Sequence, residues 1–263
     1  MVIVRIISHR NRVVRQVVFM VLFFVSLTPG RAQTIIGTTG MMNVPTADMR
    51  PAGTFDGGVS FMQKGLLYNS YFKNRTFGKK DGYEQEDYST FLFYVSFTPF
   101  PWMELTFRET LFKTQKSRTD TEAEKSLLDR SWSARIQPLK EGKYWPAVVV
   151  AVNDIFTSGG SSPYAAVYGV VSKHVPLQNI GTFEATVGYA HPVKKGKTYD
   201  GVMGGLSFAP AFFPDMRVMA EYDTRGYNVG VGAFLFKHLN VTCFTREFKG
   251  FSATVSYQYT IKY

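Results

Sequence analysis

Between Gly250 and Tyr263 the chain alternates strictly between apolar and polar residues. The apolar set takes every second position: Phe251, Ala253, Val255, Tyr257, Tyr259, Ile261 and Tyr263. Ser, Thr, Gln and Lys fill the positions between them. A period of two with one apolar face is typical of a strand that is wet on one side only. In an outer-membrane β-barrel the apolar face contacts lipid and the polar face lines the lumen. The stretch therefore predicts the terminal strand of such a barrel.

The N-terminal stretch 1–32 predicts a secretory signal peptide. Its first part is basic, and Val17–Leu27 is an apolar run too short to span a bilayer comfortably. Gly30-Arg31-Ala32 supplies small residues at the cleavage positions, so we expect the cut before Gln33. The alternative is an uncleaved anchor helix. The single cysteine, Cys243, is far from this site, which excludes a lipid-acceptor cysteine, an internal disulfide and a cysteine-based zinc site.

The basic charge of the chain comes largely from its first 32 residues. These residues hold five Arg and no acidic residue. The expected cleavage would therefore lower the formal charge from +10 to +5, with 25 basic and 20 acidic residues left. The charge then gives no support for a nucleic-acid partner, and we expect none. The 23 Phe and 15 Tyr suit the aromatic girdles of a membrane barrel. A soluble, aromatic-rich β-sandwich is the alternative on composition alone.

Twelve segments of the length that a tilted membrane strand needs follow residue 52. They are expected near 53–63, 88–98, 102–113, 130–138, 145–154, 163–173, 181–190, 200–209, 215–223, 226–236, 240–248 and 250–263. The predicted fold is all-β: a closed antiparallel transmembrane β-barrel of about 12 strands after a cleaved signal peptide. The predicted organisation is a signal peptide at 1–32, a leader or plug segment at 33–52 and the barrel at 53–263.

Most connections between these segments alternate in length, although two expected outward connections, Thr224–Arg225 and Lys249, are tight. Long polar connections are expected at Lys64–Asp87, Thr114–Asp129, Phe156–Ser162 and His191–Tyr199. Short ones are expected at Pro99–Pro101, Leu139–Tyr144, His174–Ile180, Pro210–Pro214 and Lys237–Leu239. Long loops outside and short turns inside are the habit of outer-membrane barrels, and a sandwich has no reason for them. The pattern predicts an outer-membrane protein with both termini in the periplasm.

The segment Thr34–Arg50 does not follow the strand pattern. Gly37 and Gly40 are spaced in a way that spoils a strand, and Pro45-Thr46 predicts a turn. Two interpretations stay open. In one, the segment folds into the lumen as a plug with Gly37, Gly40, Pro45 and Thr46 as its motif; in the other, it is an ordered leader to the first strand.

Three blocks of the sequence resemble a known family. The first is Gly37–Met49 followed by Gly53-Thr54-Phe55, the second is Thr98–Leu105 with Arg108, and the third runs from Glu141–Ala147 through Asn153-Asp154 to Tyr168–Lys173. Their order and spacing resemble those of the YjbH-like exopolysaccharide and capsule outer-membrane proteins. The resemblance implies a barrel tied to secretion or assembly of an extracellular polysaccharide. Many members of that family are much longer and resemble two barrel units, and some are lipoproteins.

Charged residues within the expected strands predict a polar lumen. On three strands the apolar neighbours would face lipid, which turns Glu104, Arg108, Arg135, Arg217 and Glu221 inward. An Arg that faces lipid at mid-depth costs about 2–4 kcal/mol, which favours the inward assignment. These five residues form a candidate polar cluster of the lumen. They either contact a sugar chain or a plug, or they are ion pairs that fill a narrow barrel.

The sequence offers no support for catalysis or for a cofactor. The mature chain has three histidines, His174, His191 and His238, and no G-x-S-x-G or other nucleophile motif accompanies them. His174 and His238 fall in expected turns, where a solvated residue is the simpler interpretation. We found no spacing of metal ligands. We therefore expect no enzyme, no catalytic residue, no cofactor and no metal; an acyl-transfer enzyme is a remote alternative.

The expected function is a non-enzymatic outer-membrane component of exopolysaccharide or capsule export or assembly. A structural or small diffusion barrel is the alternative. The expected partners are outer-membrane lipid and lipopolysaccharide, the barrel-insertion machinery, and a polysaccharide with its export proteins. The insertion machinery is expected to recognise the lipid face of the last strand, with Tyr257, Tyr259, Ile261 and Tyr263 as the insertion signal. The alternative role of Tyr263 is that of an ordinary interface aromatic.

Overall fold

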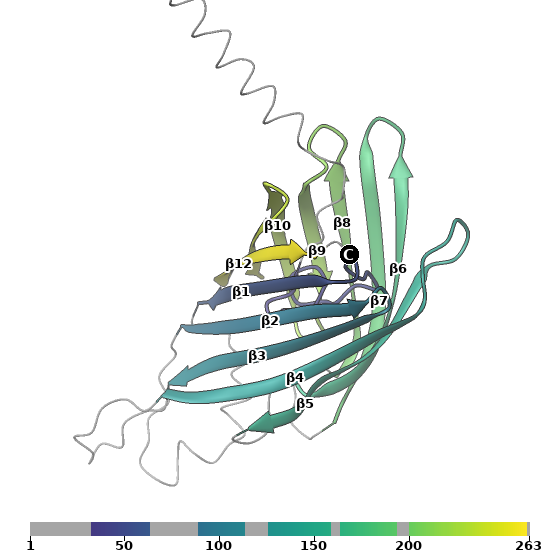
Figure 1. The fold of residues 1–263 in the computed structure, drawn as a ribbon. Coiled ribbons are helices and arrows are strands. Elements are labelled where there is room, and N and C mark those ends of the chain that lie inside the picture. Colours follow the sequence, from purple (N-terminus) through teal and green to yellow (C-terminus); the bar gives the residue numbers. More distant parts are fainter. Residues whose placement is uncertain (1–32, 64–88, 114–125, 159–163, 194–199, 262–263) are drawn as a thin grey trace, which may run out of the picture.

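The fold is a closed antiparallel barrel of twelve strands in a computed structural model (Figure 1). The structure describes residues 33–63, 89–113, 126–158, 164–193 and 200–261. The expected signal peptide, the connection expected at 64–87 and Tyr263 lie outside these residues. Of the connection expected at 114–129, residues 114–125 lie outside them, and 126–129 belong to a strand instead. The strands are β1 (Thr54–Met62), β2 (Thr90–Phe100), β3 (Met103–Lys113), β4 (Ser126–Leu139), β5 (Ala147–Ser158), β6 (Ala166–Leu177), β7 (Gly181–Pro192), β8 (Gly201–Pro210), β9 (Met216–Tyr222), β10 (Tyr227–Leu235), β11 (Leu239–Arg246) and β12 (Gly250–Thr260).

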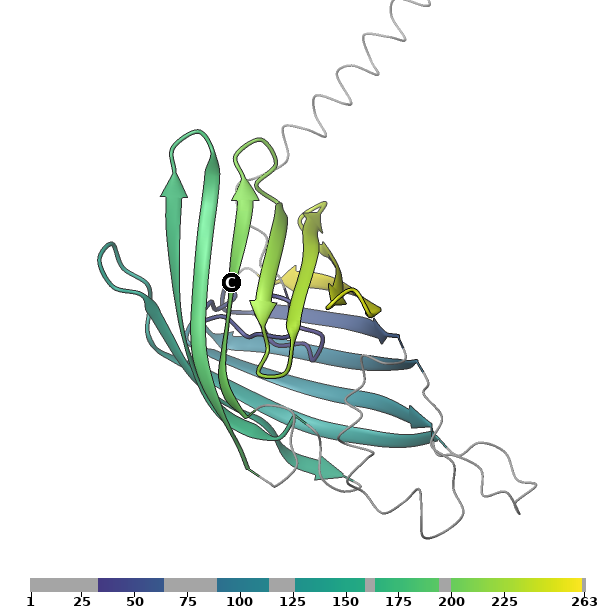
Figure 2. The same ribbon diagram turned by 180° about the vertical axis from the view of Figure 1, so that it is seen from behind.

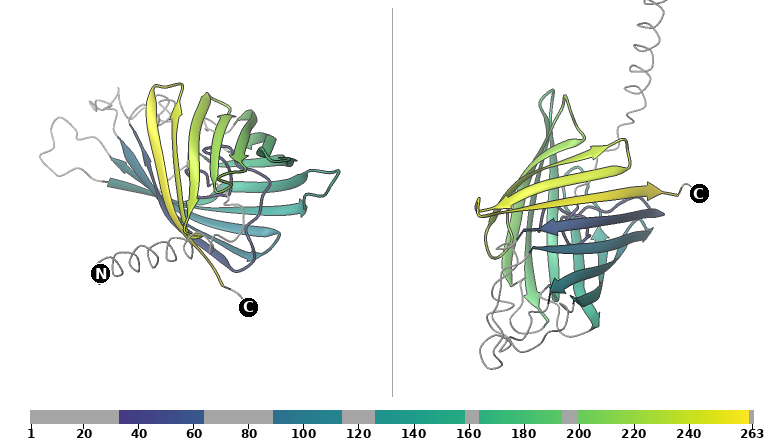
Figure 3. Two further views of the ribbon diagram at one scale, coloured as in Figure 1. Left: turned by 90° about the horizontal axis from the view of Figure 1, so that it is seen from above. Right: turned by 90° about the vertical axis from the view of Figure 1, so that its left-hand side faces the viewer.

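Each strand pairs with its neighbour in the sequence, and β1 pairs with β12 to close the barrel. The closing register runs from Thr54 opposite Thr260 to Met62 opposite Ser252. The view on the right of Figure 3 shows the two strands side by side. Closure pairs the backbone groups of both terminal strands, which a sheet in lipid requires because hydrocarbon offers no hydrogen bonds. The prediction of a closed barrel of about twelve strands is confirmed.

The outer surface of the barrel is apolar, and the inner surface is mostly polar. Along β2, Phe91, Phe93 and Val95 are exposed while Leu92, Tyr94 and Ser96 are buried. The same alternation makes Val218 of β9 and Val231 of β10 exposed. Rings pack across neighbouring strands on this surface, as in the stacked pair Phe55–Phe97, whose centroids lie 4.3 Å apart. An apolar outer face around a closed barrel is the form of a transmembrane β-barrel.

The described connections between consecutive strands lie at the two ends of the barrel. The end that we call the turn end carries the connections 101–102, 140–146, 178–180, 211–215 and 236–238. The connections 223–226 and 247–249 belong to the opposite end, the loop end. Among the described residues no helix is long and apolar enough to cross a membrane.

The expected strand ends are close to the observed ones, with one correction that matters for function. His174 was expected in a turn, but β6 continues to Leu177. The ladder with β7 continues past His174, which lies opposite Glu184, to Leu177 opposite Gly181. Pro176 pairs with Thr182 near the strand end, where the missing N–H costs little of the ladder. His174 is therefore part of the barrel wall.

The lumen contains the chain's own N-terminal segment. Every residue from Gln33 to Arg50, which we call the inner segment, is buried. Figure 2 shows it as a purple trace that runs between the two sides of the wall. Its apolar residues, Ile35, Ile36, Met41, Met42, Val44 and Met49, form one hydrophobic cluster with inward-facing residues of the wall. This cluster explains why stretches such as 91–95 are apolar on both faces: the inward residues pack against the inner segment.

Candidate functional site

Glu104 of β3 is the centre of a buried charge network between the wall and the inner segment. Its carboxylate accepts hydrogen bonds from the backbone N–H and the hydroxyl of Thr39, with N–O and O–O distances of 3.0 and 2.5 Å. Arg135 of β4 and Arg50 lie 3.1 and 3.2 Å from the same carboxylate. The register of β3 and β4 explains the Glu104–Arg135 pair, since these residues are directly opposite each other on neighbouring strands.

Arg135 also binds the backbone of the inner segment. Its guanidinium donates to the carbonyl oxygen of Thr39 at 2.7 Å and to the carbonyl oxygens of Thr46 and Asp48. Arg50 extends the network to Asp56 of β1 at 3.6 Å. The result is an alternating row of charges, Asp56–Arg50–Glu104–Arg135, all almost fully buried. Buried charges are tolerated when they are paired and hydrogen-bonded in this way.

Glu221 of β9 binds the inner segment from another side of the lumen. Its two carboxylate oxygens accept the backbone N–H groups of Met42, Asn43 and Val44 at 3.1, 2.7 and 3.1 Å. Three successive N–H donors around one carboxylate hold a sharply folded stretch of backbone in place. Glu104 and Glu221 thus bind the inner segment from different strands of the wall.

The inner segment also meets the wall through neutral groups. Ser60 of β1 and Ser96 of β2 donate to the carbonyl oxygens of Ile35 and Gly37 at 2.9 and 2.5 Å. Ser172 of β6 accepts the N–H of Ala47 at 2.7 Å. Gly37 has a φ of 90°, and a Cβ at that position would lie 2.5 Å from the ring of Tyr94. Only glycine fits there.

The other residues of the motif Gly37, Gly40, Pro45 and Thr46 lie in the same buried fold. Gly40 pairs with Pro45 in an isolated antiparallel bridge, and Met41 N–H donates to the Val44 carbonyl at 2.9 Å. A Cβ on Gly40 would lie 2.6 Å from the Val44 carbonyl oxygen, so the reversal needs a small residue. The carbonyl of Thr46 is one of the acceptors of Arg135.

The five expected lumen charges are all buried and face inward, but they do not form one cluster. Glu104 and Arg135 lie together, whereas Glu221 stands with Asn228 and the inner segment. Arg108 pairs with Asp154 of β5 at 2.7 Å. Arg217 lies 3.4 Å from Glu184 of β7.

Asp154 is a buried charged residue of the interior that the alternation of the sequence could not identify. Trp132 pairs with Phe156 and Ala134 with Val152, so β5 carries extra residues at this point. In this bulge Asp154 has a φ of 52°, and Asn153 and Asp154 are both buried. A bulge redirects a side chain that regular pleating would send to the other face. The third family-like block contains Asn153-Asp154, which was the only available signal.

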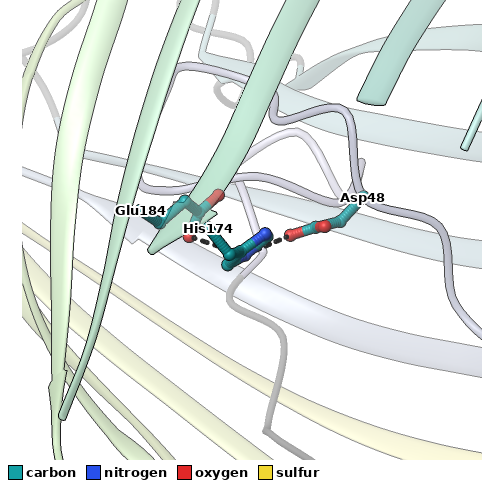
Figure 4. A group of neighbouring side chains, drawn as sticks. All are labelled: Asp48, His174 and Glu184. Atoms are coloured by element: carbon teal, nitrogen blue, oxygen red, sulfur yellow. Dashed lines mark ion pairs between the residues drawn. The ribbon is translucent and has the colours of Figure 1, made fainter. Parts of the chain in front are cut away.

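A second group of ionisable residues lies at the turn end, where the inner segment passes His174. We call Asp48, His174, Glu184 and Glu141 the mouth cluster; Figure 4 shows His174 between Asp48 and Glu184. His174 Nε2 lies 3.7 Å from Asp48 Oδ2 and 3.8 Å from Glu184 Oε2. Its Nδ1 lies 2.7 Å from Glu141 Oε2. Although burial acts to raise the pKa of Glu141, hydrogen bonds from His174 and Lys173 outweigh it and hold that pKa below its usual range.

The expected insertion signal lies on the outer surface as far as it is described. Tyr257, Tyr259 and Ile261 are exposed. The ring of His238 stacks on Tyr257 with centroids 5.4 Å apart, and its Nδ1 lies 2.9 Å from the carbonyl oxygen of Gln258. His238 thus lies at the turn end without a carboxylate among these partners. Recognition by the insertion machinery stays a prediction.

A family comparison agrees with the sequence motifs. The model of the YjbH family, described as "Exopolysaccharide biosynthesis protein YbjH", matches residues 82–195. The predicted resemblance is confirmed over this range, and the first block, which ends at Phe55, lies outside it. The matched range includes the second and third blocks and, with them, Glu104, Arg108, Arg135, Asp154, His174 and Glu184. A search of curated proteins finds no match.

Solved outer-membrane barrels resemble the chain at low sequence identity. A KdgM porin shares 8% identity over 80% of this chain and 99% of its own, with a TM-score of 0.45. The outer membrane phospholipase of Salmonella typhi, a dimer with bound calcium, shares 10% over 80% and 91%, with a TM-score of 0.37. The outer membrane phospholipase A from Escherichia coli shares 9% over 81% and 98%, with a TM-score of 0.36. Similarity at this level carries no argument about what the chain binds or does.

Proposed function

We propose that this chain is a non-enzymatic outer-membrane component of exopolysaccharide export or assembly, whose lumen is closed by its own inner segment. The observation that carries the proposal is the binding of Gln33–Arg50 to the wall by Glu104, Arg135 and Glu221. The family match supports the link with exopolysaccharide. The apolar outer surface supports the location in the outer membrane.

A general diffusion barrel is the weaker candidate because such a barrel needs an open aqueous lumen. Porins of that kind usually have about 16 or more strands, whereas this barrel has twelve and holds a buried segment inside. The inner segment makes polar contacts with β1, β2, β3, β4, β6 and β9. Solute passage would require these contacts to be exchanged for water.

Loss of the gene tests the proposed role. We expect its deletion to lower the amount of extracellular polysaccharide, and the wild-type chain to restore it. Glu109→Gln is a suitable control for complementation, since the ion pair that Glu109 forms among the described residues is a long one, at 3.6 Å, with the exposed Arg130. Unchanged polysaccharide together with reduced uptake of small solutes would favour the diffusion barrel and contradict the proposal.

A further inference from the structure

The mouth cluster combines ligand types that suit a transition metal. One oxygen of Asp48, one ring nitrogen of His174 and one oxygen of Glu184 lie within 4.8 Å of one another. Ca²⁺ and Mg²⁺ prefer sets made of oxygen ligands only, whereas an imidazole with carboxylates suits Zn²⁺ and its neighbours. Three protein ligands with one position left for water is a common arrangement of an open zinc site.

The histidine is already oriented as a metal ligand requires. Glu141 accepts a hydrogen bond from Nδ1, and the backbone N–H of His174 donates to the same carboxylate at 3.0 Å. This contact puts the proton of a neutral ring on Nδ1 and leaves the lone pair of Nε2 directed between Asp48 and Glu184. The separations of 3.7 and 3.8 Å are too long for hydrogen bonds. Ligand atoms around a tetrahedral zinc ion lie about 3.3 Å apart, so both carboxylate oxygens would move closer to Nε2 when an ion binds.

A second observation points to a missing ligand. Glu184 is almost fully buried, and its Oε1 atom has no hydrogen-bond partner among the residues that the structure describes. Its other oxygen, Oε2, is the one that lies 3.8 Å from His174 Nε2; it accepts from Ser207 at 2.9 Å and lies 3.4 Å from Arg217. A buried carboxylate oxygen without a partner is costly, and a cation bound by both oxygens of Glu184 would remove that cost. Arg217 balances part of the negative charge but does not use Oε1.

We propose that Asp48, His174 and Glu184 bind one divalent transition-metal ion, with Glu141 as the positioning residue behind His174. Asp48 belongs to the inner segment, whereas His174 and Glu184 belong to β6 and β7. The ion therefore ties the inner segment to the wall at the turn end. The site itself does not depend on the proposed role in polysaccharide export, because its test measures metal binding alone.

Zn²⁺ titration of the mature chain tests this site. The chain is refolded in detergent, treated with a chelator and titrated by calorimetry, with Co²⁺ absorption as a second probe of nitrogen and carboxylate ligation. We expect one Zn²⁺ per chain, and a fall in affinity of at least about 10- to 100-fold in His174→Ala and in Asp48→Asn. Glu141→Gln is expected to weaken binding about tenfold while the stoichiometry is kept.

His238→Ala is the matched control, since His238 also lies at the turn end but contacts Tyr257 and a backbone carbonyl. Its affinity for Zn²⁺ should equal that of the wild type. Heat-modifiable gel mobility verifies that each variant folds. If His174→Ala does not fold, Asp48→Asn still tests the site. No Zn²⁺ binding by the folded wild type, or equal binding by Asp48→Asn, would overturn the proposal and leave a protonated His174 paired with carboxylates as the explanation of the cluster.

Discussion

The charge of Glu104 is expected to stabilise the barrel interior, because two buried arginines share its carboxylate. Glu104→Gln keeps the shape of the side chain but leaves Arg135 and Arg50 without their shared carboxylate. Removal of one partner from a buried ion pair costs about 3–5 kcal/mol, so we expect a clear fall in the unfolding midpoint in detergent. Glu247→Gln breaks the exposed pair with Lys249 in the connection after β11 and should leave the midpoint nearly unchanged. Equal midpoints for the two variants would show that the Glu104 network is not stabilising.

Gly37 is the residue at which backbone conformation limits the inner segment. Gly37→Ala adds a Cβ at a φ of 90° and 2.5 Å from the ring of Tyr94. We expect a loss of about 1–3 kcal/mol in unfolding free energy, from strain and overpacking together. Gly57→Ala is the control, because its Cβ would meet nothing nearer than 3.9 Å. Denaturant titration of both variants measures the difference, and a Gly37→Ala barrel as stable as Gly57→Ala contradicts the packing described here.

At the scale of elements, we expect the inner segment to determine whether the lumen conducts. We expect the complete chain to give no large steady openings in planar bilayers. A chain in which 34–49 is replaced by a Gly-Ser linker of equal length keeps the connection to β1 but loses the partners of Glu104 and Glu221. It should show frequent openings at the same protein concentration. An absence of openings with both proteins would mean that the wall side chains close the lumen without the inner segment.

The elements were predictable to different degrees. Strands such as β2 and β12 alternate between apolar and polar residues, because one face contacts lipid and the other faces the interior. Their positions could therefore be predicted to within a few residues. The path of Thr34–Arg50 could not be predicted, because the wall residues that bind it, on β3, β4 and β9, are far away in sequence. Glu104 and Glu221 were predictable as inward-facing charges, but not their partners. Asp154 was missed because a bulge interrupts the pleat.

The whole molecule depends on its outer face remaining apolar. Val231 is in the middle of β10 and is exposed on that face. Val231→Arg is expected to cost about 2–4 kcal/mol in reversible folding into lipid vesicles, since the guanidinium must stay near the bilayer centre. Phe236→Arg, in the turn after β10, should cost only about 0–1 kcal/mol because the turn lies near the interface. Similar costs at the two positions would contradict the proposed placement of the barrel in the bilayer.

Only Pro51, Ala52 and Gly53 join the buried Arg50 to the first residue of β1. Gly53 is fixed between two strands: its N–H donates to Thr98 at 2.8 Å, and its carbonyl accepts from Ile261 at 3.1 Å. A segment released from the lumen therefore stays tethered beside the opening, where a short link gives it an effective concentration on the order of millimolar. Rebinding of the inner segment is intramolecular, so an opened lumen closes again without a partner. A separate peptide of the same sequence would have to approach a millimolar concentration to take the place of the inner segment.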